Sequence, residues 1–161
     1  MLKTKVEIPQ QQIIDYSSNY SFLGSCFSEH LSQKMIESGF DVQANPFGVV
    51  FNPITLAEIL LESDETIQNS VFEREDVSLS WMANSTCFSY SQDELKSKLL
   101  EQRKVFLNSL STSKVLFVTF GTAWIYEKKA SNRIVGNCHK APSQEFEKKL
   151  LSTDEITTKW S

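Results

Sequence analysis

The stretch YSFLGSCFSEHLSQKMIES, residues 20–38, contains the change of pattern that decides the fold. Its first four residues are a short apolar run that Gly24 closes, which predicts a buried strand. Residues 28–38 then place their apolar side chains at helical spacing, and Gly39 ends that pattern. The sequence therefore predicts a strand, a tight turn and a helix, with the turn near residues 24–27.

The segments that follow indicate an α/β fold. Residues 40–42 predict a second strand, and residues 53–62 predict a helix that opens at Pro53 and ends by Ser63. Residues 114–120 are an almost unbroken run of β-branched and aromatic side chains, typical of a central strand buried on both faces. We expect a mainly parallel sheet with helices on both faces and functional groups at the carboxyl ends of its strands.

The remaining segments predict less regular structure. Residues 64–90 predict an irregular excursion, and Ser91 is a candidate N-cap for a long amphipathic helix. Two short strands at 124–127 and 133–135 predict a hairpin, and a further helix is expected after Pro142. A last helix begins near residue 153 with few apolar residues to bury, so we expect the chain to be a fragment of a longer protein. Because the sheet of such a fragment is incomplete, we expect it to be poorly soluble or to self-associate when expressed alone.

Composition limits the classes of function. The 161 residues are 40% apolar and 22% charged, which is typical of a single globular domain. The net charge of −4 gives no basic surface for a phosphate backbone, so we expect no nucleic-acid partner. We also expect no cofactor.

Cysteine usage and the first residues indicate a cytoplasmic protein. Three cysteines, at positions 26, 87 and 138, are an odd number and do not predict a disulfide framework. The opening MLKTKVEIP reaches a charge or a proline before any apolar run of signal-peptide length. We therefore expect neither secretion nor a membrane span. The adjacent pair Cys138 and His139 is a poor geometry for two ligands of one ion, so we expect no metal site.

The predicted turn is the best candidate for chemistry. A tight turn between a strand and a helix holds a small side chain beside the free N–H groups of the helix, which favour negative charge. Cys26 at this place is a candidate nucleophile, because the thiolate is the form that attacks carbonyl groups. The alternative is that Cys26 is a small buried apolar residue.

Four separated blocks then carry a resemblance over nearly the whole chain. They are Gly24-Ser25-Cys26-Phe27-Ser28, Asn45-Pro46-Phe47-Gly48 with Asn52-Pro53, Thr119-Phe120-Gly121-Thr122-Ala123-Trp124, and Asn137-Cys138-His139-Lys140. In this order the blocks resemble the GSCFA family, with Ser28 in place of the final Ala of its motif. GSCFA proteins are longer, so the resemblance implies that residues 1–161 are the N-terminal portion of one GSCFA domain.

The resemblance implies a place in the SGNH (GDSL-like) hydrolase superfamily, whose α/β three-layer members hydrolyse or transfer acyl esters. Aligning the superfamily block Gly-Asp-Ser onto Gly24-Ser25-Cys26 puts Cys26 at the nucleophile position. A shifted alignment makes Ser25 the nucleophile. We favour Cys26, since the third position is where that turn exposes a side chain.

The other superfamily blocks imply groups that bind substrate or the oxyanion. Gly48 is the one glycine in the loop of the second block, and it is either an oxyanion donor or a plain turn glycine. Gly121-Thr122 begins the third block, but Ala123 stands where the superfamily has an oxyanion-hole Asn. Asn137 is the candidate to replace that amide, and Asn45 is a further candidate for substrate binding.

The general base is open at this stage. The superfamily uses a His near the C-terminus of the domain, whereas no His follows Ser143 here. His139, or a His beyond Ser161, is the candidate, and His30 lies one helical turn after Cys26. We expect an acyl hydrolase or acyltransferase acting on a small-molecule or carbohydrate ester or a thioester. The alternative is a degenerate domain that binds an acyl or carbohydrate ligand without turnover.

Overall fold

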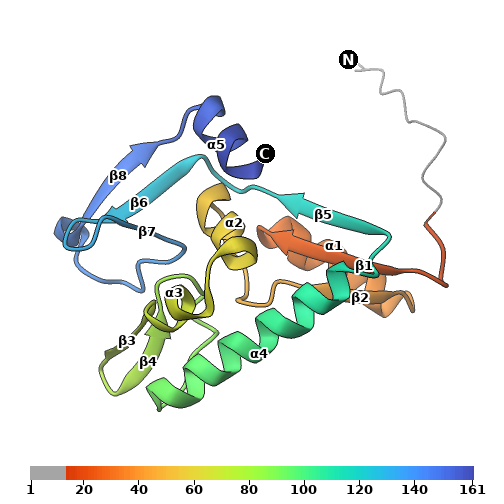
Figure 1. Cartoon of the computed structure of the whole chain (residues 1–161), viewed down its shortest axis with the longest axis horizontal. Helices are drawn as coiled ribbons and strands as arrows, with labels where there is room; N and C mark the ends of the chain where they lie inside the picture. Colours follow the sequence, from red (N-terminus) through yellow and green to blue (C-terminus); the bar gives the residue numbers. More distant parts are fainter. Residues whose placement is uncertain (1–13) are drawn as a thin grey trace, which may run out of the picture.

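Three parallel strands form the sheet that carries the predicted turn. In the computed structural model, which describes residues 14–161, β1 (Asn19–Gly24) lies between β2 (Asp41–Ala44) and β5 (Val115–Thr119) (Figure 1). The register pairs Gly24 with Thr119, so the turn after β1 begins beside the carboxyl end of β5. The predicted α/β class with a parallel sheet is confirmed. The alternation of Val6 and Ile8 predicts an edge strand or arm near the N-terminus, and both residues lie outside the described residues.

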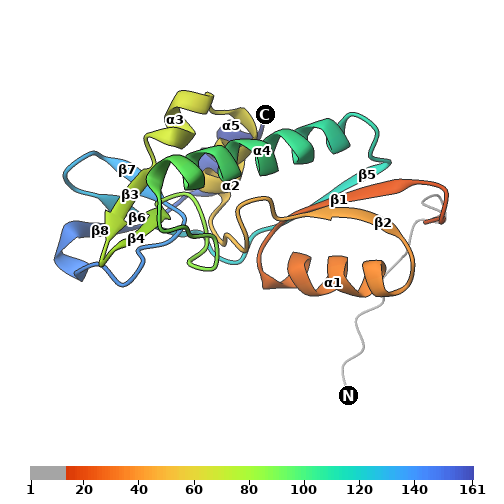
Figure 2. The ribbon, with the colours of Figure 1, turned by 90° about the horizontal axis from the view of Figure 1, so that it is seen from below.

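Two helices cover opposite faces of this sheet. Figure 2 shows α1 (Cys26–Glu37) on one face and α4 (Gln92–Leu110) on the other. α1 begins two residues before the predicted helix, because Ser25 and not a later residue is its N-cap. The predicted cap of α4 is confirmed, since Ser91 Oγ accepts the N–H of Glu94. No helix within residues 14–161 combines the length and the apolar character needed to cross a membrane.

The largest apolar cluster lies on the α4 side of the sheet and joins it to α2 (Pro53–Leu61). Asn52 caps α2 through its side chain, which accepts the N–H of Thr55, and Pro53 occupies the first turn as predicted. Its fully buried members come from β1, the loop between β2 and α2, α2 itself and α4: Leu23, Phe47, Val50, Leu56, Ile59, Leu95 and Leu99. This cluster fixes the loop between β2 and α2 next to the turn after β1.

Residues 64–90 are more regular than predicted. They form α3 (Asp64–Gln68) and an antiparallel hairpin of β3 (Val71–Arg74) and β4 (Val77–Ser80). The hairpin turn places Glu75 and Asp76 at φ values of 51° and 64°. Two successive left-handed residues are the geometry of a tight hairpin turn, which usually has Asn and Gly there. Because Glu75 and Asp76 are not typical turn residues, the sequence pattern did not predict this hairpin.

A second antiparallel sheet follows β5. The predicted hairpin is confirmed as β6 (Trp124–Lys128) and β7 (Arg133–Val135), and β8 (Phe146–Leu150) pairs with the other side of β6. The helix expected after Pro142 is wrong, because only a 3-10 turn forms at Ser143–Glu145 before β8 begins. The spacing of Phe146 and Leu150 fits one helical turn, but pairing with β6 satisfies the backbone of this segment as a strand. α5 (Thr153–Trp160) then begins at a capping box, as its sequence predicts.

β5 differs from the central strand that its sequence predicts. Among the described residues its only partner is β1, so β5 is an edge of the parallel sheet. Its side chains are partly exposed, and Leu116 retains 36% of its accessible surface. The opposite edge strand, β2, exposes the polar residues Asp41 and Gln43, whereas β5 has no charged residue.

Candidate active site

The turn after β1 requires glycine at its first position. Gly24 has a φ of +140°, and a Cβ there would lie 2.1 Å from the carbonyl oxygen of Thr119. Its N–H donates to Asn45 Oδ1 at 2.8 Å, and its carbonyl accepts the N–H of Val50 at 3.1 Å. The end of β1 is therefore fixed against both β5 and the loop after β2.

The Thr119 side chain binds the hydroxyl groups of the turn. Its Oγ1 lies 2.9 Å from Ser25 Oγ and 2.7 Å from Ser28 Oγ, and its carbonyl accepts the N–H of Ser25 at 3.0 Å. Ser25 is 5% exposed, and its Oγ also accepts the N–H of Phe27 as the cap of α1. The Ser25 hydroxyl is thus buried, and its contacts with Thr119 and Phe27 stabilise the turn.

Cys26 is the group that the turn leaves accessible. It is the first residue of α1, its thiol is free, and its side chain is exposed. The interpretation of Cys26 as a small buried residue is therefore wrong. Since the first N–H groups of a helix have no partner within the helix, Cys26 stands at the end of the 12-residue α1 that favours negative charge.

Asn45 and Gly48 support the turn through their own hydrogen bonds. Asn45 is 8% exposed at a φ of +41°, and its Nδ2 donates to Glu29 Oε2 at 2.7 Å in addition to its bond with Gly24. The Gly48 N–H donates to the Asn45 carbonyl at 2.8 Å. Gly48 has a φ of +72°, and a Cβ there would lie 2.8 Å from Asn84 Cβ. In this structure Gly48 acts as a turn glycine with its N–H already bonded.

Gly121 and Thr122 lie next to the turn but direct their N–H groups elsewhere. Both N–H groups donate to the carbonyl of Phe51, at 2.9 and 3.2 Å. A Cβ on Gly121 would lie 3.2 Å from Ser25 Cβ and 2.5 Å from the Phe51 ring. These contacts place Phe51 beside the turn, on the side of the loop that precedes α2.

His139 is packed away from the turn. Its Nε2 lies 2.7 Å from the Ser80 carbonyl, its ring makes edge contacts with Phe72 and Trp81, and it is 7% exposed. Burial lowers the pKa of His139, and its Nδ1 is buried without a hydrogen-bond partner among the described residues. The β3–β4 hairpin that it contacts lies at the opposite end of the molecule from α1 (Figures 1 and 2).

Asn137 shares that loop with His139. Its Oδ1 accepts the His139 N–H at 2.8 Å, and both His139 and Lys140 have positive φ values. The Asn137 side chain lines a cavity with Phe51, not with Cys26. The structure therefore does not bring the Asn-Cys-His-Lys block onto the sulfur of Cys26.

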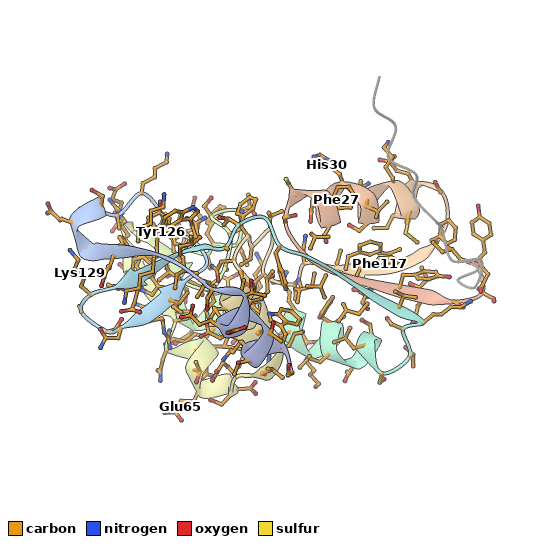
Figure 3. All side chains as sticks on the ribbon, turned by 90° about the horizontal axis from the view of Figure 1, so that it is seen from above. Phe27, His30, Glu65, Phe117, Tyr126 and Lys129 are labelled. Carbon is orange, nitrogen blue, oxygen red and sulfur yellow. The ribbon has the colours of Figure 1, made fainter. Side chains whose placement is uncertain are left out.

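His30 is the histidine that lies near Cys26 along the chain. It is exposed on α1, four residues after the cysteine. Figure 3 shows Phe27 and His30 on the outer side of this helix, while Tyr126 lies in the other half of the molecule. Residues four apart on a helix are neighbours on one face, so His30 is the histidine that shares a face of α1 with Cys26.

Comparison with known families decides the classification of the chain. The model of the GSCFA family matches residues 19–161. The chain belongs to the GSCFA family. A search of the curated proteins gave no match, and a search of the solved structures gave none either. The match covers the turn, the Asn45 loop, the end of β5 and the His139 loop, so all four blocks of this GSCFA chain lie within the matched residues.

Three supporting residues of the GSCFA turn escaped the sequence analysis. Thr119 binds Ser25 and Ser28, Glu29 binds Asn45, and Phe51 contacts Gly121. The available signal for Thr119 is that it is the one hydroxyl residue in the otherwise apolar run 115–120, at the carboxyl end of the strand. Glu29 lies in the first turn of α1, where an acidic residue is common for a different reason.

The other two cysteines of this GSCFA chain are less accessible than Cys26. Cys87 is buried in the main core and Cys138 is half-buried, and burial raises the pKa of both thiols. Within residues 14–161, no group of three or more His, Cys, Asp and Glu side chains is arranged to hold a metal ion.

Proposed function

We propose that the chain is an SGNH-like acyl hydrolase or acyltransferase in which Cys26 attacks an ester or thioester carbonyl. The observation that carries the proposal is the division of roles within the turn. Ser25 is buried and bonded to Thr119, whereas the neighbouring Cys26 is exposed at the first position of α1. A nucleophile needs this access, and a capping residue does not.

The arrangement of the sheet supports the superfamily assignment. The order β2-β1-β5 is parallel throughout, and helices lie on both of its faces, as in three-layer α/β hydrolases. Ligands of open α/β sheets bind outside the carboxyl ends of the strands. Cys26 lies two residues after the end of β1, and Gly121 lies two residues after the end of β5.

The proposed reaction begins with the thiol of Cys26. His30 takes the thiol proton, and the sulfur forms a bond to the carbonyl carbon of the substrate. The resulting negative oxygen is stabilised by the unpaired N–H of Cys26 at the start of α1. The carbon–oxygen or carbon–sulfur bond to the leaving group then breaks, and the leaving alcohol or thiol takes the proton from His30. Water or an acceptor alcohol releases the acyl group from Cys26.

Acyl-enzyme formation is the direct test. Incubation with p-nitrophenyl acetate and with an acetyl thioester is expected to release the leaving group and to add one acetyl mass to a peptide that contains Cys26. Cys26→Ala is expected to abolish both signals, whereas Cys87→Ala removes a thiol of the main core and leaves them unchanged in the folded protein. Release that persists in Cys26→Ala would exclude Cys26 as the nucleophile.

The histidines are tested in the same assay. His30→Gln is expected to lower the rate about 100-fold or more, which is the usual contribution of a general base. His139→Gln is expected to change stability but not the rate measured on folded protein. The opposite ranking would transfer the base role from His30 to His139.

A catalytically degenerate binding domain is the second candidate function. It is supported by Ala123, which stands where the superfamily has an oxyanion-hole amide, and by a cavity that Cys26 does not line. The absence of turnover and of acylation in the native protein, together with binding of a neutral acyl amide, would favour this candidate over the enzyme.

A further inference from the structure

A cavity of about 430 Å³ lies between the loop before α2 and the sheet of β6, β7 and β8. Such a volume is within the range of pockets for small organic ligands. Its walls come from the loop before α2, from β6 and β7, and from the segment that leads to β8: Val49, Phe51, Tyr126, Val135, Gly136, Asn137, Cys138, Ala141, Ser143 and Phe146.

The walls of this cavity carry no formal charge. None of the ten residues is acidic or basic, and burial raises the pKa of the Cys138 thiol, which keeps it neutral at physiological pH. A charged ligand group would lose its water without gaining a partner there. The cavity is therefore suited to an uncharged ligand.

Two aromatic side chains in the walls have no ring partner. Phe51 and Tyr126 are 42% and 41% exposed, and neither pairs with another ring among the described residues. The Lys148 ammonium lies 6.0 Å from the Tyr126 ring centroid but does not line the cavity. Exposed ring faces in a concave, neutral site favour a flat aromatic ligand.

Asn137 supplies one hydrogen-bond donor to the cavity. Its Oδ1 already accepts the His139 N–H at 2.8 Å, which fixes the orientation of the amide. Its Nδ2 has no partner within residues 14–161. The remaining donor suits a carbonyl or hydroxyl oxygen of the ligand.

Phe51 joins the cavity to the catalytic turn. Its ring lines the cavity, and it lies 2.5 Å from the place of a Cβ on Gly121, which in turn borders Ser25. We propose that this cavity binds an uncharged aromatic group, with its ring against Phe51 and Tyr126 and an acceptor oxygen on Asn137. The assignment of this group to a substrate of Cys26 depends on the proposed function, whereas its binding does not.

The test measures binding of small amides in the absence of turnover. Benzamide, cyclohexanecarboxamide and benzoate are titrated into the Cys26→Ala protein, and the amide NMR signals of Gly136 and Asn137 are followed. Benzamide is expected to bind about 2- to 10-fold more tightly than cyclohexanecarboxamide, which has a similar size but no aromatic ring. Equal affinity of these two compounds, or tighter binding of benzoate than of benzamide, would overturn the proposal.

Four variants test whether benzamide binds in this cavity. Ser143→Trp places a large side chain at the exposed rim of the cavity and is expected to abolish benzamide binding, while Ser131→Trp, in the β6–β7 turn, is the matched control. Asn137→Ala is expected to weaken benzamide about 5- to 10-fold. Tyr126→Leu keeps apolar surface and is expected to remove the preference for benzamide over cyclohexanecarboxamide.

The two proposals fail in different ways. If benzamide leaves the signals of Gly136 and Asn137 unchanged at saturating concentration, the aromatic site is wrong whatever the acylation assay shows. If benzamide binds as expected and Cys26 is never acylated, the site stands and the catalytic proposal is wrong.

Discussion

The turn at residues 24–28 and the loop at residues 137–140 both contain reactive residue types. The turn exposes its reactive side chain, whereas the loop buries its own. In the turn, the hydroxyls of Ser25 and Ser28 bind Thr119, and Cys26 is left exposed. In the loop, the histidine itself is buried among aromatic rings.

The difference shows that a motif residue has to be assigned by its partners as well as by its type. Both segments contain residues at positive φ and are held by hydrogen bonds. In the turn, Ser25, Ser28 and Thr119 supply this support, and Cys26 makes no side-chain hydrogen bond among the described residues. In the loop, His139 supplies the support, because its Nε2 binds the end of β4 through the Ser80 carbonyl.

Gly24→Ala is expected to have the largest effect, because it breaks the turn on one side of the comparison. The added Cβ would lie 2.1 Å from the Thr119 carbonyl oxygen at a φ of +140°, so β1 and β5 must separate. A loss of about 3 kcal/mol or more in the free energy of unfolding is expected. Denaturant unfolding monitored by circular dichroism measures it.

Gly39→Ala is the control for this substitution. Gly39 has a φ of +88°, but a Cβ added there would meet open space, with a ring carbon of Tyr16 at 4.0 Å as its nearest neighbour. Only the backbone cost of about 1 kcal/mol is expected there. Equal losses for the two variants would mean that the contact with Thr119 does not shape the turn.

Asn45→Ala is expected to have the next largest effect on stability. The substitution leaves the buried N–H of Gly24 without its acceptor and frees Glu29 from its partner. We expect a loss about 2 kcal/mol greater than that of Asn132→Ala. Asn132 also has a positive φ, at 52°, but its exposed side chain makes no hydrogen bond within the described residues, so it isolates the side-chain contribution. A similar cost at both positions would contradict the role of Asn45 in the turn.

The pH dependence of stability tests the other side of the comparison. Burial lowers the pKa of His139, so below pH 6.5 the unfolded chain binds a proton that the folded chain does not. Stability should therefore fall as the pH decreases below about 6.5, by at most about 1.4 kcal/mol per pH unit. His139→Gln is expected to remove this fall, and His30→Gln, on the exposed face of α1, is expected to keep it.

The ionisation of Glu58 changes stability with pH in the opposite direction to that of His139, so its effect has to be eliminated by substitution. Burial raises the pKa of Glu58 to about 7, so the folded chain binds more protons than the unfolded chain between pH 4.5 and 7. Its contribution to stability is lost as the pH rises through 7. The histidine variants are therefore compared in a Glu58→Gln background at pH 5, 6, 7 and 8. If His139→Gln leaves the pH dependence of the free energy of unfolding unchanged in this background, the imidazole is not buried in solution.

Sequence patterns predicted the elements whose stability is local. The cap of α4 at Ser91, the proline start of α2 and the glycine at the turn after β1 are all marked by local residue types, and all three are confirmed. β8 was predicted as a helix because its pairing with β6 depends on residues about 20 positions away. The β3–β4 turn was missed because Glu75 and Asp76 are unusual at positive φ.

The candidate site divides in the same way. The strand-turn-helix pattern placed Cys26 correctly at an exposed helix start, because Gly24 and Ser25 mark the turn and the helix cap in the local sequence. The fate of His139 depends on Ser80 and Trp81, about 60 residues earlier, and no local pattern reports such contacts. Motif membership alone could therefore not distinguish an accessible imidazole from a buried one.

The smallest expected effect on stability is that of Cys26→Ala, and the reactivity of the thiols compares the two segments directly. Iodoacetamide is expected to modify Cys26 first, Cys138 more slowly and Cys87 last, because Cys26 is exposed while burial raises the pKa of the other two thiols. Mass spectrometry of peptides sampled over time gives the three rates. Cys26→Ala should change the free energy of unfolding by less than about 0.5 kcal/mol, since the side chain is on the surface. If Cys138 instead reacts as fast as Cys26, the 137–140 loop opens in solution, His139 becomes accessible with it, and the contrast between the two segments is lost.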